Sequence, residues 1–270
     1  MTDSKHSFVC YLPTAVGGID NFQFFENNNK LQLTHIIFGN NFNNSVDNLP
    51  PTVTHLTLGA LFNNEVDKLP PHLTHFTVGS SFNKSIDKLP HTITHLILLH
   101  TKIPCNIEKL PPNLQQLSLV VGEETRLDNL PLTITHLVLT NYHNNPPLPI
   151  STLFSCFPPK LTHLECWLPA YSIINNWPSS LTEVTFTWAI CAKNIENLPI
   201  SIQKLKIRQL YYSNRIIEAF PPNLTHLICG DVNFYCDFSI MTPNLTHLTF
   251  GNNFDHFIRN KLPKSLTHLT

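Results

Sequence analysis

The stretch LPPTVTHLTLGALFNNEVD, residues 49–67, sets the pattern of this chain. The same phrase begins again at residue 69 as LPPHLTHFTVGSSFNKSID, and an earlier version runs from residue 30 as KLQLTHIIFGNNFNNSVDN. A fixed period of about twenty residues is typical of a solenoid, in which each repeat stacks on its neighbours. This period therefore decides the fold, and the other features of the sequence lie within it.

The first apolar residue of the LTHLTL phrase defines position 1 of each repeat. It occurs twelve times, at Leu33, Val53, Leu73, Ile93, Leu114, Ile134, Leu161, Leu181, Ile202, Leu224, Leu245 and Leu266. No linker interrupts the series, so residues 33–270 are predicted to form a single solenoid of about twelve repeats, mostly of 20–22 residues. The repeat at 134–160 is longer, and the last repeat is incomplete. Residues 1–32 are irregular and are predicted to form an N-terminal cap over the first open core face.

Within a repeat, the apolar residues occupy positions 1, 4, 6, 10, 14 and 17. In the second repeat these are Val53, Leu56, Leu58, Phe62, Val66 and Leu69. The alternation of positions 3 to 6 predicts a short β-strand, and the LxxLxL spacing is that of a leucine-rich repeat. Each return segment ends in Leu-Pro, which disfavours helix. We therefore expect a leucine-rich-repeat-like solenoid (horseshoe) with a parallel β-sheet on the concave face, extended or 3₁₀ segments on the convex side and little α-helix.

Three residues after the strand recur in the regular repeats. Gly59 is predicted to let the chain turn away from the sheet. Phe62 is predicted to fill the interior, and the Asn63 side chain to bond backbone groups freed by the turn. Cys166 and Cys229 lie at position 6, where a small hydrophobic side chain is expected to be buried.

The composition excludes several classes of protein. The 270 residues are only 13% charged with a formal net charge of −1, so the chain has no basic excess for binding a nucleic-acid backbone. The apolar runs are too short for a membrane span, and the N-terminus lacks the apolar core of a secretory signal. Seven cysteines without a CxxC pair indicate neither a disulfide framework nor a zinc knuckle. A reducing compartment and a cytoplasmic location are expected.

The phrase Phe82-Asn83-Lys84-Ser85-Ile86, together with LPPxLTHL, resembles the FNIP repeat. The resemblance covers about residues 31–270 and is strongest in the first three repeats and at residues 254–258. That family is a variant of the leucine-rich repeats, common in social amoebae and in large DNA viruses of protists. The resemblance implies a binding solenoid without catalytic residues, in the host cytoplasm if the protein is viral. Family members often carry an N-terminal F-box, for which residues 1–32 are too few.

Histidine occupies position 3 in nine of the twelve repeats, on the face turned away from the core. These residues are His35, His55, His75, His95, His136, His163, His226, His247 and His268. Equivalent residues of adjacent strands lie about 5 Å apart, so the imidazoles are expected to form a row. One interpretation is a stacked ladder of neutral rings that bond the adjacent Thr hydroxyls. The other is metal binding by neighbouring rings. The ladder is favoured because a row has no unique geometry, so no metal site is predicted.

The histidine row is interrupted in the middle of the series, where charged and aromatic residues gather. The candidate partner-binding residues are Glu165, Trp167, Glu183, Trp188, Lys204, Lys206, Arg208 and Tyr211. Charges and large aromatics on a concave face are typical of a partner site. The alternative is simple drift of degenerate repeats. The long repeat adds the segment NNPPLP at residues 144–149, which is expected to form a stiff loop beside the binding face.

The predicted function is non-enzymatic protein–protein interaction inside the cell. If the chain is viral, as the resemblance allows, its partners are expected to be host proteins. The alternative is a substrate-recognition subunit for a ubiquitin ligase, with the F-box supplied elsewhere. No Ser-His-Asp order, paired acids or glycine-rich phosphate loop indicates an enzyme, and no cofactor is predicted. The sequence ends within the last strand, at His268-Leu269-Thr270, so self-association through this strand edge is expected.

Overall fold

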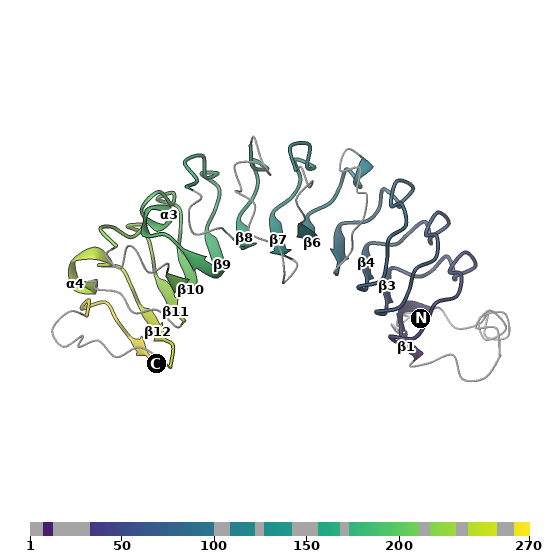
Figure 1. The fold of residues 1–270 in the computed structure, drawn as a ribbon, viewed down its shortest axis with the longest axis horizontal. Coiled ribbons are helices and arrows are strands. Elements are labelled where there is room, and N and C mark those ends of the chain that lie inside the picture. The colour runs from purple at the N-terminus through teal and green to yellow at the C-terminus, as the bar shows by residue number, and fades with distance from the viewer. Residues whose placement is uncertain are drawn as a thin grey trace, which may run out of the picture. The chain divides into compact units, whose positions relative to one another are not determined.

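The computed structural model describes residues 8–12, 33–99, 109–121, 127–141, 156–167, 173–210, 217–230, 237–252 and 262–270. The chain forms two compact units, Met1–Val120 with Asn129–Ile134, and Val121–Asp128 with Thr135–Thr270. Each unit is a stack of turns in which each turn adds one strand to a parallel sheet (Figure 1). The predicted leucine-rich-repeat-like solenoid with little helix is confirmed.

The described residues of the first unit form six strands in chain order. They are β1 (Phe8–Leu12), β2 (Leu33–Phe38), β3 (His55–Leu58), β4 (His75–Val78), β5 (His95–Leu98) and, apart from its last residue, β6 (Gln116–Val121). β2 to β6 follow the predicted repeats, and each pairs in parallel with the next. β1 comes from the segment predicted to be a cap, and it pairs with β2 through Cys10 opposite Ile36. The leading segment therefore adds a strand to the sheet.

The second unit repeats the same architecture. Its strands are β7 (His136–Asn141), β8 (His163–Cys166), β9 (Glu183–Ile190), β10 (Lys204–Leu210), β11 (His226–Cys229), β12 (His247–Phe250) and β13 (His268–Leu269). Two short helices, α3 (Ala192–Glu196) and α4 (Phe238–Met241), lie in return segments. Within the described ranges, neither helix has the length or apolar content to cross a bilayer.

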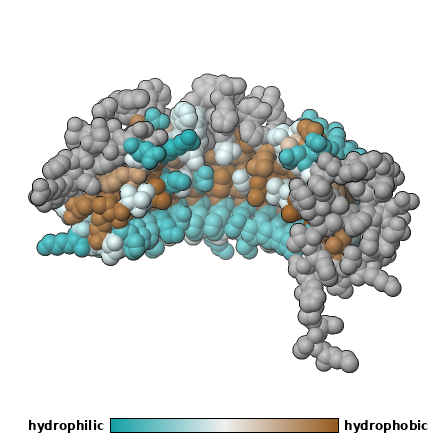
Figure 2. Space-filling view, turned by 90° about the horizontal axis from the view of Figure 1, so that it is seen from below, coloured by the Kyte–Doolittle hydropathy of each residue, from teal (hydrophilic) through white to brown (hydrophobic). Residues whose placement is uncertain are grey.

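The core of each unit consists of the apolar positions of successive turns. In the second repeat, Val53, Leu56, Leu58, Phe62 and Val66 are each at most 1% exposed. The Phe62 ring stacks between those of Phe42 and Phe82, with centroid distances of 6.0 and 6.1 Å. In Figure 2, hydrophilic residues (teal) gather in a band beside the hydrophobic residues (brown). The predicted inward position of the repeated Phe is therefore confirmed.

Prolines and glycines fix the two turns of each regular repeat. The Val53 amide donates to the Pro50 carbonyl at 3.1 Å, and the Phe62 amide donates to the Gly59 carbonyl at 3.3 Å. A Cβ added to Gly59 would lie 2.3 Å from the Gly39 oxygen, and one added to Gly79 would lie 2.4 Å from the Gly59 oxygen. Glycine is required because the backbones of successive turns touch here, which is a different reason from the turn flexibility that the sequence suggested.

The asparagines after the repeated Phe bind the next turn. The Asn43 Oδ1 atom accepts a hydrogen bond from the Asn63 amide at 2.8 Å, and the Asn63 Oδ1 atom accepts one from the Asn83 amide at 2.9 Å. The prediction that these side chains satisfy backbone groups is confirmed. Each bond links two turns, so it also fixes their register.

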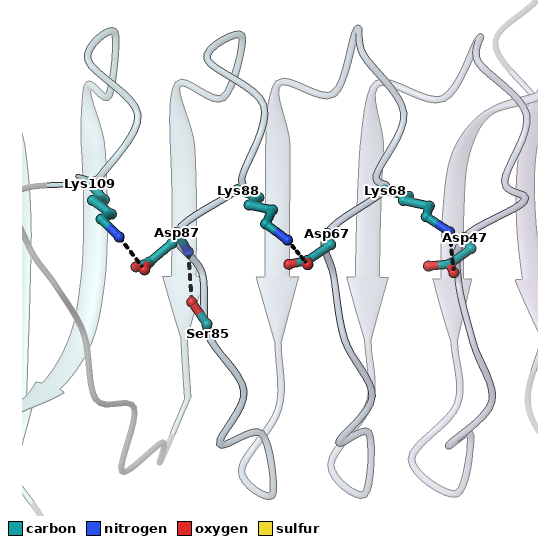
Figure 3. Close-up of polar contacts among 7 residues, drawn as sticks. All are labelled: Asp47, Asp67, Lys68, Ser85, Asp87, Lys88 and Lys109. Atoms are coloured by element: carbon teal, nitrogen blue, oxygen red, sulfur yellow. Dashed lines mark hydrogen bonds and ion pairs between the residues drawn. The ribbon is translucent and has the colours of Figure 1, made fainter.

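Carboxylates and ammonium groups form a second ladder on the return segments (Figure 3). Each aspartate pairs with the lysine of the following turn: Asp47 with Lys68, Asp67 with Lys88, and Asp87 with Lys109. The hydrogen bond from Lys88 to Asp67, with the attraction of that carboxylate, raises the pKa of Lys88. These exposed pairs contribute little stability individually, because solvent screens their charges. They do favour one register of turn against turn.

Replacing Phe62 by Ala is expected to lower the free energy of unfolding by about 3–5 kcal/mol, because it leaves a cavity between two stacked rings. Urea or thermal unfolding of the purified chain measures the change. Leu61→Ala is the matched control, since the neighbouring Leu61 side chain is 53% exposed. Equal destabilisation by the two substitutions would contradict the inward position of Phe62.

Replacing Gly79 by Ala is expected to destabilise the first unit by about 1–3 kcal/mol, because the new methyl group would overlap the Gly59 carbonyl. Ser80→Ala, at the next and exposed residue, is the control and should have little effect. Thermal unfolding followed by circular dichroism compares the two variants. If Gly79→Ala matched the parent, the turns would not pack as closely as described.

Histidine rows and a candidate partner-binding surface

Four of the position-3 histidines form one stack in the first unit. Parallel pairing places His35, His55, His75 and His95 opposite one another on β2 to β5. Their ring centroids are 3.9, 4.0 and 3.9 Å apart, and successive planes differ by 13–16°. The imidazoles therefore stack face to face on the solvent-facing side of the sheet.

The second unit holds two shorter stacks. His136 and His163 stack with centroids 4.0 Å apart. His226, His247 and His268 stack at 4.2 and 4.1 Å. Between the two stacks the same row passes through β9 and β10, where the side chains are not histidine.

The threonine before each histidine completes the ladder. In all nine cases the Thr hydroxyl and the His Nδ1 atom form a hydrogen bond of 2.8–2.9 Å, as in Thr74 with His75. The Thr74 hydroxyl also lies 3.1 Å from the Thr54 carbonyl of the preceding turn. Each imidazole is thus held in one orientation by its own strand.

Stacked rings are poorly placed to share a metal ion. An ion needs each nitrogen lone pair to point at it from about 2.0–2.1 Å, whereas the lone pairs of nearly parallel rings run side by side. In the part of the chain that the structure describes, no three His, Cys, Asp or Glu side chains come together as a metal-binding group. The geometry favours the packed ladder.

Several of the stacked histidines have pKa values below the ordinary histidine value. Burial, followed by repulsion from His95, His55 and His35, lowers the pKa of His75 to about 4. Burial is also the main cause of the lowered pKa values of His55, His95 and His247. These rings are therefore neutral near pH 7, and this allows them to stack without charge repulsion.

Glu183 and Lys204 interrupt the row in the second unit. The Glu183 Oε2 atom lies 3.2 Å from the Lys204 Nζ atom and 3.4 Å from the His163 Nε2 atom. The carboxylate thus joins β8, β9 and β10 at position 3. Glu183 and Lys204, both predicted to bind a partner, thus form a polar cluster with His163 of the histidine row.

The remaining predicted residues of β8 and β10 lie on the same side of the sheet. Parallel pairing places Lys206 opposite Thr185, which in turn lies opposite Glu165. Lys206 and Arg208 are exposed, and the Arg208 Nη1 atom donates weakly to the Thr187 carbonyl at 3.5 Å. Among the described residues, no carboxylate forms an ion pair with either cation.

A β-bulge brings Trp188 into this surface. Ile207 pairs with Phe186, but Gln209 pairs with Ala189, so Thr187 and Trp188 together oppose Arg208. Strict alternation after Val184 and Phe186 would bury Trp188. Instead Trp188 is 50% exposed, and Ala189 is buried. The Trp188 and Trp167 rings are 6.2 Å apart. Bulges redirect side chains in this way and are frequent beside functional sites.

Sequence reasoning selected Trp188 but did not foresee the bulge. A signal was present, because the apolar alternation of Val184 and Phe186 shifts by one residue to Ala189. Ile228 was missed: it pairs with Lys206 and is 41% exposed. Tyr211 and the inserted segment 144–149 lie outside the described residues.

Comparison with known families agrees with the repeat pattern. The FNIP Repeat family model matches residues 32–61 and 238–270. Two segments of the chain thus match the FNIP repeat, and together they make up less than half of it. Between these two segments, position 3 of each strand pairs with position 3 of the next through β4–β6 and through β7–β11, although the Phe-Asn signature is mostly lost after the third repeat.

Two solved structures are similar to this chain. CroV588, a circular LRR protein of a giant virus, is 27% identical, with a TM-score of 0.58 over 88% of this chain and 40% of CroV588. This chain thus spans 40% of the length of that protein. Internalin InlF of Listeria monocytogenes is 14% identical, with a TM-score of 0.47 over 88% of this chain and 80% of InlF. No match was found among curated proteins.

The histidine stack makes the stability of the first unit depend on pH. Unfolded histidine binds a proton near pH 6.5, but His75 does so only near pH 4. The unfolded chain therefore binds more protons between these values, and stability should be full above about pH 6.5 and fall toward pH 4. His75→Gln, which copies the Gln116 of β6 at the same position, should reduce this fall in melting temperature.

The exposed turn residue His72 supplies the control, because His72→Gln removes a histidine without touching the stack. Melting temperatures of the parent and both variants are measured from pH 7.5 to 4.5. A parent curve that stays flat over this interval would count against the stacked, proton-poor ladder.

Proposed function

We propose that this chain is a protein-interaction solenoid that binds a partner through the solvent-facing side of β8, β9 and β10. The bulge at Thr187–Trp188 is the observation that carries the proposal, because it brings an exposed tryptophan beside Arg208 and Trp167. Tryptophan and arginine dominate the binding energy of protein interfaces. The LRR-type scaffold is consistent with such a role.

The contrast with the first unit supports the choice of this surface. On β2 to β5, position 3 carries only histidines, whose rings stack on one another and whose Nδ1 atoms hydrogen-bond the preceding threonines. On β9 and β10, the equivalent row carries Glu183 and Lys204, and the pairing of these two strands is interrupted further along by the bulge. A departure that exposes a large aromatic ring is explained more simply by binding than by stability.

The chain is proposed to act inside a cell, and in the host cytoplasm if it is viral. Cys156, Cys166, Cys191 and Cys229 are free thiols, which suits a reducing compartment. Burial raises the pKa of the Cys166 thiol, so this cysteine is a core residue without thiolate reactivity. The likeness to CroV588, a protein of a giant virus, supports a viral origin. Self-association through β13 stays a prediction from the sequence.

The double substitution Trp188→Ala with Arg208→Gln should abolish capture of native partners while leaving the fold intact. Each change is expected to weaken binding by about 2 kcal/mol or more, as for interface hot spots. Affinity purification from cells, with circular dichroism as the folding check, measures the effect. Lys160→Gln with Leu61→Ala is the control, since both side chains are exposed on turns.

Undiminished capture by the double variant would contradict the proposed surface. Recovery of ubiquitin-ligase core subunits by the parent chain would instead favour the second hypothesis, a substrate-recognition subunit with its F-box on another chain. That hypothesis predicts that some of the captured proteins become ubiquitinated.

A further inference from the structure

β10 presents three cations on one face. Lys204, Lys206 and Arg208 occupy alternate positions and are all exposed. Alternate residues of a strand are separated by about 6.6–6.8 Å. Glu183 already neutralises Lys204, at 3.2 Å. Lys206 and Arg208 therefore remain as a pair of cations with fixed spacing, without a carboxylate in ion-pair contact among the described residues.

The residues beside this pair leave it accessible from the sheet side. On β9, Thr185 lies opposite Lys206, and Thr187 lies opposite Arg208 together with the bulged Trp188. Beyond the end of β11, Gly230 packs so closely that an added Cβ would lie 2.6 Å from the Arg208 carbonyl oxygen. The side chains of Lys206 and Arg208 are both exposed, so a ligand can approach both from the sheet side.

Apolar groups flank the cations on both sides. The exposed Trp188 ring lies next to Arg208 at the bulge, with the Trp167 ring 6.2 Å further on. Ile228, also exposed, pairs with Lys206 from β11. A ligand that covers these groups removes water from the charges and strengthens their attraction for an anion.

We propose that this surface binds an extended peptide segment with two acidic residues at positions i and i+2 and one large apolar side chain. This inference rests on the proposed function and names the class of partner. An extended peptide aligned with β10 projects i and i+2 to one face with the same spacing as Lys206 and Arg208. The planar guanidinium of Arg208 suits a carboxylate through paired hydrogen bonds. The apolar side chain packs on the tryptophan pair.

Glu165 limits which acidic segments fit. It lies in the same row as Lys206, two strands away, with Thr185 between them. Two strand spacings are about 9.6 Å, so an acidic run that extends across the sheet toward β8 meets a like charge. The surface therefore selects a short acidic pair along β10 over a long polyacidic tract.

The test uses the full chain and a fluorescein-labelled, capped peptide in which two glutamates alternate with threonines and a leucine follows. Fluorescence anisotropy is measured at low and at physiological ionic strength, because binding by exposed cations weakens with salt. The glutamate peptide should bind, and its glutamine counterpart should bind at least about tenfold more weakly. Equal binding of the two peptides would overturn the acidic requirement.

Lys206→Gln with Arg208→Gln should also weaken the glutamate peptide by at least about tenfold. Lys160→Gln with Lys264→Gln removes the same net charge from exposed turn positions, and should leave affinity unchanged. Equal losses in the two double variants would show a general charge effect and overturn the assigned site. Tighter binding of a peptide with phosphoserines in place of the glutamates would overturn the carboxylate assignment in favour of a phosphate ligand.

Trp188→Ala tests the apolar contact separately. It should weaken the leucine peptide but have little effect on a peptide with alanine in place of leucine, and equal losses would overturn that contact. If no acidic peptide binds while Trp188→Ala with Arg208→Gln still abolishes native capture, the proposed function stands and the acidic-peptide inference fails. If capture also persists, both fail.

Discussion

Hydrogen bonding of each turn to the turn before it is the constraint on which the rest of this structure depends. The Thr74 and His75 amides both donate to the Thr54 carbonyl, at 2.8 and 3.0 Å, and the equivalent bonds recur in both units. This pairing holds successive turns about one strand spacing apart, roughly 4.8 Å. Every side chain therefore lies next to its own counterpart in the neighbouring repeats, and each position must accept a copy of itself at that distance.

This constraint explains the residue types of the regular repeats. Glycine at Gly59 and Gly79 accepts a backbone contact that a Cβ would block, and phenylalanine stacks on phenylalanine in the core. The side-chain Oδ1 atom of Asn63 accepts a hydrogen bond from the Asn83 backbone amide, while the Asn63 backbone amide donates to the Oδ1 atom of Asn43. Histidine fits the solvent-facing row because burial and its neighbours keep rings such as His75 neutral near pH 7. A row of lysines at this spacing would repel itself.

The repeat period predicted the strands, the buried apolar positions, the buried Cys166 and Cys229, and the role of Asn63, because these features depend on the period and on local patterning. Phe8–Leu12 was assigned to a cap because it lacks the repeated phrase, and its backbone pairs in parallel with β2, with an irregularity between Phe8 and Val9. The bulge was missed because it depends on the register between β9 and β10. The candidate residues were selected by type from single strands, whereas their spacing exists only after the strands have paired.

Departures from the period are informative because each of them gives up a favourable contact. At β10, three cations lie where a stacked repeat would carry histidine and small polar residues, and only Lys204 has a carboxylate beside it among the described residues. At β9, the bulge interrupts the ladder and leaves Trp188 half exposed to water. Neither change improves the packing of a solenoid, since β9 could pair with β10 without a bulge if Thr185 and Thr187 alone faced the solvent here. A partner that covers the tryptophans and supplies acidic groups to β10 would satisfy both departures at once, and a stability argument accounts for neither.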